Sequence, residues 1–582
     1  MTATGIDGLV RAASLSELRA AGRLIVSLGG HTLCLFADGD AVHAVDNRCP
    51  HMGFPLHRGS VADGILTCHW HHARFDLCSG GTFDQWADDL RRFPVELRGD
   101  DVYVDVAPRA DRVAHARKRI RDGLERNIPL VLAKATITLT ESDPTGVEAF
   151  ADGLAFGVER RGDGWGRGLT TLTCFMNLAP RLDIADVPVA LYHGLADVSA
   201  EAAGEPPRFP LDPLPSEGPD VSALGRWFRR FVEVRDAEGA ERALVSAVRV
   251  GASPTELADM LFAAATDHRY LDGGHALDFV NKSLEALDAV GWAHAEAVLA
   301  SLPVQIASAE RMEESNAWRN PVDLVDLLDG AFERIPTALG AGNARRVGWS
   351  GRSELVELVL GDDPAASVDA MLEAVGEGAD EVELASAVSF AAATRIARFP
   401  TTNEFGDWDT ALHTFTFANA VEQGLRRSPS RELFRGVLDA AMSIYLDRFL
   451  NVPATRLPLP TRTADPNTLL DDLSRVFERQ QEVDEAGTLV ASFLARGGDS
   501  DRLVSVLGAA LTREDRNFHT IQCLEASVRQ SELLRGTEAA GLPLVAAARY
   551  LAAHAPTTRS QRQTFDIARR LHRGERLYEE VS

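Results

Sequence analysis

The sequence predicts a multidomain chain with an N-terminal all-β domain over residues 1–107 and a large all-α domain over residues 130–582. Three observations predict this division. Short segments rich in β-branched residues, separated by Gly and Asp turns, fill the first part. After Pro108, apolar residues recur every three or four positions, which is the period of an amphipathic helix. One helix-pair pattern then recurs along the second part and indicates four pseudo-repeats of about three helices.

The elements of the first part follow from local patterns in chain order. The segment ASLSELRAAG predicts one short helix. Strands are then expected at GRLIVSLG, HTLCLFAD, AVHAVDN, ILTCHW, HARFDL, FPVEL and DVYVDVA. Residues 111–126, DRVAHARKRIRDGLER, predict a charged helix, so we interpret residues 108–129 as a helical linker between the two domains.

Two short segments of the first part carry the clearest chemical pattern. Cys49-Pro50-His51 is followed, after sixteen residues, by Cys68-His69-Trp70-His71. Each segment therefore offers one thiolate and one imidazole. A Rieske [2Fe–2S] centre needs two Cys on one iron and two His on the other, so the expected ligands are Cys49, His51, Cys68 and His71. The alternative is a structural zinc site, but zinc fingers pair Cys with Cys and His with His.

The residues around these positions carry a resemblance. CPHMGFPLHRG and ILTCHWHHARFDLCSGG resemble the two cluster-binding loops of the Rieske family, and residues 1–107 resemble a whole Rieske ferredoxin-type domain. His72 stands where the family usually has Gly. Trp70 and Phe75 are expected either to shield the cluster or to be ordinary core aromatics.

The resemblance also indicates a branch of the family. High-potential respiratory members carry an additional Cys in each loop, joined as a disulfide, and here the matching positions are Phe54 and Trp70. The domain therefore resembles the low-potential ferredoxin and oxygenase branch. Within an acidic chain we expect a midpoint toward the low end of the family span of roughly −150 to +300 mV.

The helical part contains an internal repeat. Three similar amphipathic helices lie at residues 254–269, 380–398 and 500–516, and each precedes a helix that opens with His. Those histidines are His275, His413 and His519, and the residues six positions later are Asn281, Asn419 and Glu525. A degraded copy at residues 147–161 has Thr171 in the His place and Asn177 six positions later. A third helix is expected to follow the second helix in each copy.

Equivalent positions of closed repeats turn toward a shared centre, so His275, His413 and His519 are expected to meet and to bind one non-haem iron. Further candidate residues are His193, His268, Asp267 and Glu314. The amide and acid side chains six positions later are expected to line the wall or to join neighbouring repeats. The alternative is that a His at a helix start is a capping or core residue repeated by descent, with no metal.

The helical part lacks the catalytic pattern of standard Rieske oxygenases, in which an acid or amide precedes two spaced histidines. It bears a faint resemblance to questin-oxidase-like proteins in WDTALHTFTFANAV and RMEESNAWRNP. No flavin or NAD domain is evident, because GDGWGRG (162–168) lies between helices rather than after a strand. Electrons must then come from an external ferredoxin or reductase.

The composition excludes some classes of function. The formal net charge of −25 disfavours binding to nucleic acid or to an anionic membrane surface. The N-terminus lacks the basic start and apolar run of a signal peptide, and no apolar stretch reaches the ~18 residues of a membrane span. We therefore expect a soluble, cytoplasmic protein and leave its oligomeric state open.

Together these observations predict a Rieske-type non-haem iron oxidoreductase. We expect an oxygenase that oxidises a small organic substrate with O2 and electrons from an external donor. Two alternatives stay open. The chain is an electron-transfer protein that docks to a separate oxidase, or it is a redox sensor whose repeats bind a partner protein and hold no second metal.

Overall fold

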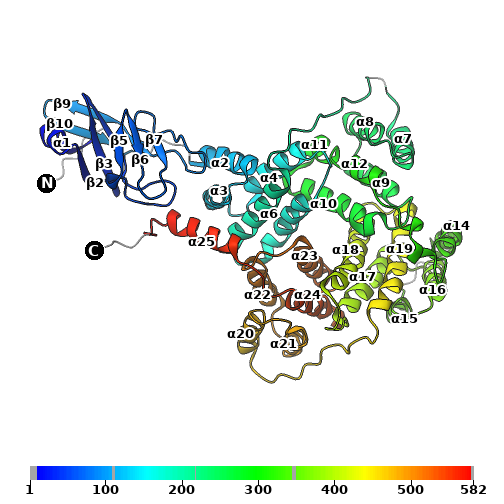
Figure 1. The fold of residues 1–582 in the computed structure, drawn as a ribbon. Coiled ribbons are helices and arrows are strands. Elements are labelled where there is room, and N and C mark those ends of the chain that lie inside the picture. The colour runs from blue at the N-terminus through cyan, green and yellow to red at the C-terminus, as the bar shows by residue number, and fades with distance from the viewer. Residues whose placement is uncertain (1–8, 108–111, 216–217, 344–348, 578–582) are drawn as a thin grey trace. The chain divides into compact units, whose positions relative to one another are not determined.

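The computed structural model describes residues 9–107, 112–215, 218–343 and 349–577 of the 582. Packing divides them into two compact units, and each is described by itself. Unit 1 takes its described residues from 1–123, 128–142 and 563–582. Unit 2 consists of residues 124–127 and the described part of 143–562. Figure 1 shows the strands of unit 1 and the helices of unit 2.

Unit 1 contains three small antiparallel sheets within the described residues. The first has the strand order β1 (Leu9–Ser14), β10 (Asp101–Asp105), β9 (Val95–Arg98). The second has the order β2 (Arg23–Leu28), β3 (His31–Asp38), β4 (Ala41–Asp46), β8 (Arg92–Phe93). The third has the order β5 (Ser60–Ala62), β6 (Ile65–Thr67), β7 (Arg74–Asp76). Helix α1 (Leu15–Ala21) lies where a short helix was expected, whereas β1 and β5 were not expected as strands.

The third sheet positions the two short Cys–His segments. Its three strands share a buried core with Cys49 and Cys68. This core includes Leu66 and Phe75, which are both fully buried. A separate core cluster lies between the other two sheets and contains Leu33, Leu35 and Val102. The two segments therefore project from a rigid apolar base, which fixes where their side chains can go.

Three helices complete unit 1. Helix α2 (Arg112–Arg126) and α3 (Pro129–Ser142) follow the strands, and most of α25 (Ser560–His572) packs with them. The sequence pattern predicts a linker over residues 108–129 and one helical domain over residues 130–582. Those boundaries stay a prediction about folding units, but by packing α3 and the end of α25 belong with the strands.

Unit 2 is helical. Its first helices are α4 (Val147–Arg160), α5 (Arg167–Leu178), α6 (Val187–Ala202), α7 (Val221–Glu233), α8 (Ala237–Arg249), α9 (Pro254–Ala265), α10 (His275–Val290), α11 (Ala295–Leu299), α12 (Pro303–Ser308) and α13 (Asn316–Arg319). They are followed by α14 (Leu324–Asn343), α15 (Arg352–Val359), α16 (Pro364–Glu377), α17 (Glu381–Ala397), α18 (Phe405–Arg427), α19 (Arg431–Asp447), α20 (Pro466–Val476), α21 (Val483–Ala495), α22 (Ser500–Thr512), α23 (Phe518–Leu533) and α24 (Leu542–Ala553). No helix of the described residues is long and apolar enough to cross a membrane.

Four helices form the centre of unit 2. Helix α5 contacts α10, α10 contacts α18, α18 contacts α23, and α23 contacts α5 again. Each also packs on the helix before it, namely α4, α9, α17 or α22. This arrangement fits the proposed helix pairs, although the fourfold repetition stays an interpretation.

The expected third helix is continuous in three of the proposed copies, as α6, α19 and α24. In the remaining copy, residues 294–315 form the short helices α11 and α12 instead of one helix. The reason is local, because Pro303 can begin a helix but cannot continue one from the preceding residues. The prediction of a single third helix is wrong for this copy.

Candidate metal centres

Each Cys–His segment of unit 1 closes on itself through the backbone. The amide of Cys49 donates to the carbonyl of Phe54 at 2.8 Å, and the amide of Gly53 donates to the carbonyl of Cys49 at 2.7 Å. Gly53 has φ +79°, which favours glycine. In the second segment the amide of Cys68 donates to the carbonyl of Ala73 at 2.8 Å. Both segments are therefore tight turns that face their side chains toward one another.

The four predicted ligands come together. The thiols of Cys49 and Cys68 lie within hydrogen-bonding reach, and the ring centroids of His51 and His71 are 4.9 Å apart. The hydrogen bond between the thiols lowers the pKa of Cys68 to about 6 and raises that of Cys49. Two sulfurs and two imidazoles thus face a shared space, which is the donor set of a mixed Cys/His iron–sulfur cluster.

The protonation of the two histidines fits metal ligation. Burial, followed by the charge of Lys134, lowers the pKa of His51 to about 4. Burial also lowers the pKa of His71. Both rings are neutral at pH 7, as metal binding requires. The Nδ1 atom of His51 is buried and has no hydrogen-bond partner among the described residues, which is expected of an atom that a metal would engage.

Aromatic rings surround this centre. Trp70 packs on His71 with ring centroids 4.4 Å apart, whereas Phe75 is a fully buried core residue. Trp70 therefore fits the expectation of a ring beside the cluster, whereas Phe75 fits the expectation of an ordinary core aromatic. Trp86, which no sequence pattern singles out, packs edge-on against His51, with ring centroids 4.6 Å apart. His72 has φ +64°, and this left-handed conformation explains why glycine suits the position.

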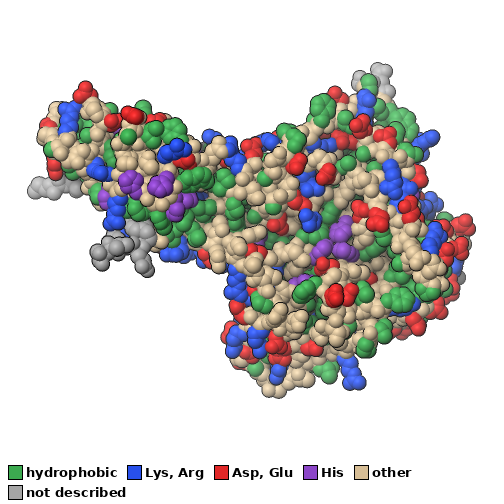
Figure 2. Space-filling view, in the orientation of Figure 1, with side chains coloured by type: hydrophobic (Ala, Val, Ile, Leu, Met, Phe, Trp, Pro, Cys, Tyr) green, Lys and Arg blue, Asp and Glu red, His purple; other side chains and the backbone are tan. Residues whose placement is uncertain are grey.

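In unit 2 the structure brings His275, His413 and His519 together. One ring nitrogen of each lies within 4.8 Å of the others. The Nε2 atoms of His413 and His519 are 2.9 Å apart, and the three rings have centroids 4.4 to 5.8 Å apart. His275 opens α10, His519 lies at the start of α23, and His413 lies within α18. We call these residues the histidine triad. Figure 2 shows histidine side chains gathered among the helices of this unit.

Hydrogen bonds to the outer nitrogens orient two rings of the triad. Nδ1 of His275 lies 2.9 Å from the carbonyl oxygen of Asp272. Nδ1 of His519 lies 3.4 Å from a carboxylate oxygen of Asp409, which also accepts from the hydroxyl of Tyr550. A metal-binding His commonly donates its other N–H to a carbonyl or carboxylate in this way. With Nδ1 as the donor, the lone pair of His275 and of His519 lies on Nε2, the nitrogen that a cation would engage.

The backbone before His275 is strained. Tyr270 and Asp272 have φ +45° and +49°, and the glycines Gly273 and Gly274 also have positive φ. The loop is held by paired backbone contacts, in which the amide of Asp272 donates to the carbonyl of Glu310 at 2.9 Å. Non-glycine residues in this conformation cost free energy and concentrate at functional sites. The strain argues against a merely repeated capping residue, since a cap needs no such loop.

All three rings of the triad are half-buried, and two of them have lowered pKa values. Burial, followed by the charges of His275 and His519, lowers the pKa of His413 to about 3. Burial also lowers the pKa of His275. Neutral imidazoles brought together away from water are costly unless each finds a partner. A cation at the centre would accept all three lone pairs, so the donor set fits a metal such as iron or zinc.

A buried polar layer lies one turn below the triad. Gln522, three residues after His519, donates to the carboxylate of Asp278, three residues after His275. Burial raises the pKa of Asp278 to about 7. Deeper in the bundle, the ammonium of Lys282 donates to Glu285 at 2.9 Å. It also donates to a carboxylate oxygen of Glu525 at 2.6 Å.

At the repeat position six residues after the His place, Asn177, Asn419 and Glu525 join neighbouring helices, as expected, whereas Asn281 does not. Asn177 of α5 donates to Glu525 of α23 at 3.0 Å, and Asn419 of α18 accepts from Gln530 of α23 at 2.9 Å. Asn281 instead donates to Glu285 on its own helix at 3.0 Å. These side chains hold the central helices together and do not reach the triad.

The four further candidates do not join the triad, since the group within 4.8 Å contains three histidines of the described residues and no carboxylate. His193 is buried on α6 between Phe175 and Tyr192. His268 lies between the carboxylates of Glu233 and Glu313. Asp267 pairs with Arg229 and Arg435. Glu314 lies in the short 3-10 helix Met312–Glu314.

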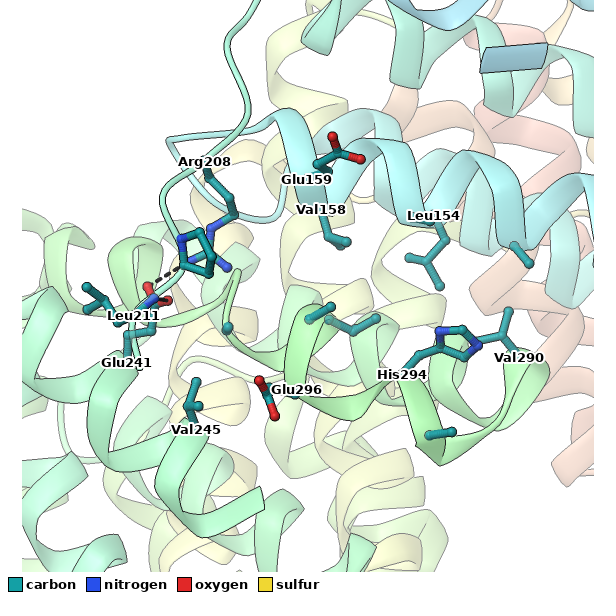
Figure 3. Close-up of a pocket in the computed structure, with 17 residues that line it drawn as sticks. Leu154, Val158, Glu159, Arg208, Leu211, Glu241, Val245, Val290, His294 and Glu296 are labelled. Atoms are coloured by element: carbon teal, nitrogen blue, oxygen red, sulfur yellow. Dashed lines mark hydrogen bonds and ion pairs between the residues drawn. The ribbon is translucent and has the colours of Figure 1, made fainter. Parts of the chain in front are cut away.

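The cavity drawn in Figure 3 is not at the triad. It measures about 550 Å³ and is lined by apolar side chains of α4, α8 and α11, with Arg208 and Glu241 paired at its edge. Val290, the last residue of α10, lines it, whereas His275 is the first residue of that helix. At ~1.5 Å rise per residue the two lie about 22 Å apart along the axis. The cavity is thus too distant to hold a molecule that touches the triad.

Comparison with known proteins places the first centre in a family. Residues 8–94 match the Rieske [2Fe-2S] domain, and residues 95–582 lie outside that match. The chain is 35% identical to human apoptosis-inducing factor 3 over 86 residues, which are 15% of this chain and 14% of the relative. It is 28% identical over 108 residues to the ferredoxin component of the naphthalene 1,2-dioxygenase system of Pseudomonas aeruginosa, covering 18% of this chain and 100% of the relative. Each of these relatives therefore matches less than a fifth of the chain.

Two further similarities are also short. The chain is 41% identical over 56 residues to the oxygenase subunit of vanillate O-demethylase of a Pseudomonas species, covering 10% of this chain and 17% of the relative. Among solved structures, the ferredoxin of carbazole 1,9a-dioxygenase from Nocardioides aromaticivorans shares 26% identity, with 18% of this chain and 100% of that chain covered and a TM-score of 0.17.

Proposed function

We propose that this chain, whose residues 8–94 form a Rieske [2Fe-2S] domain, is an oxidoreductase that passes electrons to a second, non-haem iron in its helical part. The cluster would be held by Cys49, His51, Cys68 and His71, and the second iron by His275, His413 and His519. A small organic substrate would be oxidised with O2, and an external ferredoxin or reductase would supply the electrons. The observation that carries the proposal is the convergence of three imidazoles, two of them oriented by hydrogen bonds from Nδ1, in a protein that also has a Rieske domain.

Iron suits the triad better than zinc for a chemical reason. Three histidines with open remaining positions serve both metals. Only iron can take up single electrons from a [2Fe–2S] cluster, however, because zinc has no redox chemistry. When bound, such an iron would supply a place for O2 activation.

The residues of the chain prepare the site for that chemistry. Asp409 and the carbonyl of Asp272 set the ring orientation of two ligands, and the strained loop holds the second of these acceptors in place. Burial favours the neutral form of His275 and His413, and a neutral imidazole has a lone pair to offer to a cation. Phe279 and Phe518 pack against His275 and provide an apolar wall that limits water around an organic substrate.

The proposal is tested by metal analysis of the full chain purified without oxygen. Wild-type protein should contain three irons and two acid-labile sulfides per chain, and His413→Ala should contain two of each. Cys68→Ser should lose the sulfide. His294→Ala, an exposed histidine outside the triad, is the matched control and should keep three irons. Two irons in the wild type would refute the second site and favour an electron-transfer protein or a sensor.

A second measurement addresses the reaction. With a supplied reductase and a panel of small organic molecules, the wild type should consume O2 only when a substrate is present. His413→Ala should lose this substrate-dependent uptake while its cluster is still reduced and reoxidised. Uptake that is unchanged in His413→Ala would contradict a role for the triad in the reaction.

A further inference from the structure

A lysine outside the matched Rieske domain reaches the loop that carries two of the cluster ligands. Lys134 lies on α3, and its ammonium donates to the carbonyls of Pro50 and His51 at 2.5 and 3.0 Å. It also donates to the carboxylate of Asp88 at 3.2 Å. We propose that Lys134 is a positioning residue that fixes this loop from outside the domain and raises the reduction potential of the cluster.

The choice of lysine supports a specific role. The chain contains 60 Lys and Arg residues, of which three are Lys, at positions 118, 134 and 282. An ammonium offers three donors in a compact group, and Lys134 meets three acceptors. A guanidinium is planar and larger, so it cannot direct donors at three acceptors around one point. In a chain that otherwise uses Arg, the site selects the geometry of an ammonium.

A second cation secures the same region. Arg119 of α2 donates to Asp88 at 2.7 Å and to the carbonyl of Ala87 at 3.2 Å. The segment that it holds contains Trp86, which packs on the ring of His51. The backbone of His51 is therefore fixed by Lys134, and its ring is bounded by a residue that Arg119 fixes. Helices α2 and α3 together clasp one ligand of the cluster.

The charge of Lys134 favours a reduced cluster. Lys134 and Arg119 face the carboxylates of Asp88 and Asp122, and the side chains of Lys134, Arg119 and Asp88 are largely buried. Of these charged groups, Lys134 is the one that donates to the ligand loop, so the loop meets a cation although the chain as a whole carries −25. Other charged groups around the same cleft are Asp46, Arg48, Asp89, Arg91 and His572. Reduction adds one negative charge, and a nearby buried cation is screened little by solvent, so it stabilises the reduced form.

The arrangement is tested by measuring the midpoint potential of the full chain with Lys134→Met, which removes the charge and keeps most of the stem. The equilibrium constant for reduction should fall about tenfold, which corresponds to about 59 mV for one electron. Lys118→Met is the matched control, because it removes the same charge from an exposed position on α2 and should leave the potential unchanged. Lys134→Arg keeps the charge and should retain most of the potential.

Asp88→Asn separates charge from structure. Removing this carboxylate should shift the potential in the opposite direction, to higher values, which a general loosening of the loop would not do. A Lys134→Met protein with two sulfides and the wild-type potential would overturn the proposal. If Lys134→Met assembles no cluster, an unchanged or lower potential in Asp88→Asn overturns it instead. These measurements concern the cluster alone, so their outcome is independent of whether the triad binds iron.

Discussion

The Nε2 atoms of His413 and His519 lie 2.9 Å apart, on two helices whose histidines are separated by 106 positions in the sequence. Nδ1 of His519 faces Asp409, so its proton resides there and its Nε2 is an acceptor. Without a cation, His413 can satisfy this acceptor only by donating from its own Nε2. A metal ion would replace that single proton and engage both lone pairs. The closeness of the two atoms is therefore a property of a site that is ready to exchange a proton for a cation.

Asp409 should tune metal binding at the triad. It accepts from His519 and from Tyr550, and although burial opposes its charge, these hydrogen bonds hold the pKa of Asp409 below its usual value. We expect Asp409→Asn to weaken metal affinity by about 10- to 100-fold, as loss of such a partner does elsewhere. Tyr550→Phe removes a hydrogen bond that lies one step further from the metal. It should also weaken metal affinity, but by less. Titration of the metal-free protein with Co²⁺ measures both, and equal affinities of Asp409→Asn and wild type would contradict the role.

The loop before His275 offers a matched pair of glycines. At Gly274, with φ +96°, an added Cβ would lie 3.0 Å from Phe417 Cβ and from Tyr270 Cε2. Gly274→Ala should therefore lower the free energy of unfolding by roughly 2 to 3 kcal/mol and weaken the metal site, because strain and a clash combine. At Gly273, with φ +60°, the nearest atom is 4.0 Å away. Gly273→Ala should cost only about 1 kcal/mol. Denaturant unfolding compares the two, and equal costs would refute this account.

Asp278 should make stability depend on pH. Burial raises its pKa in the folded protein to about 7, whereas the unfolded value is ~3.9. Between these values the folded state holds a proton that the unfolded state has released, so stability falls as pH rises from about 4 to 7. Asp278→Asn removes this loss and should be more stable than wild type at pH 8, by roughly 2 kcal/mol, but not at pH 4. Urea midpoints at both values decide this, and a uniform effect of the variant would contradict it.

The backbone conformation of His72 is less favourable for histidine than it would be for glycine. Its φ is +64°, and an L-residue in this region costs ~1–2 kcal/mol, partly offset by the greater freedom of glycine in the unfolded chain. His72→Gly should therefore stabilise unit 1 by about 0.5 kcal/mol with unchanged sulfide content. His72→Ala is the control, since it removes the ring and keeps the strain, and it should give no gain. Stabilisation by both variants would assign the effect to the ring instead.

Much of the first centre could be predicted because its information is local. Alternation and turn residues predicted most of the strands, and ligand spacing predicted the four candidate ligands, which lie within the residues that match the Rieske domain. The triad could be predicted only through the repeat, because three histidines more than a hundred positions apart carry no shared local signal. The convergence itself is confirmed by the 4.8 Å group, while the metal stays a proposal.

The residues that support the sites could not be predicted in the same way. Asp409, Trp86 and Lys134 act through contacts between elements that are distant in sequence, and each has an ordinary local context. Lys134 had one visible signal, the rarity of lysine, but composition alone does not say where a rare residue lies. The opposite holds around Pro303. There the local effect of a proline interrupts the third helix that the repeat predicts.

Lys282 should be essential for the stability of the central helices. It is 1% exposed and bridges Glu285 of α10 and Glu525 of α23. Burial opposes its charge, but the two carboxylates outweigh burial and raise the pKa of Lys282 well above its usual value. Lys282→Met leaves two buried carboxylates without this partner and should cost about 3 to 5 kcal/mol.

The compensating variant tests the cause. Adding Glu285→Gln and Glu525→Gln to Lys282→Met removes the orphaned charges, so the triple variant should recover most of the lost stability, because neutral amides still bond to Asn177 and Asn281. Thermal unfolding of the single and triple variants at one pH measures the difference. A triple variant less stable than Lys282→Met would show that the ion network adds net stability beyond its mutual neutralisation. A single variant as stable as wild type would show that Lys282 is not charged in the folded protein.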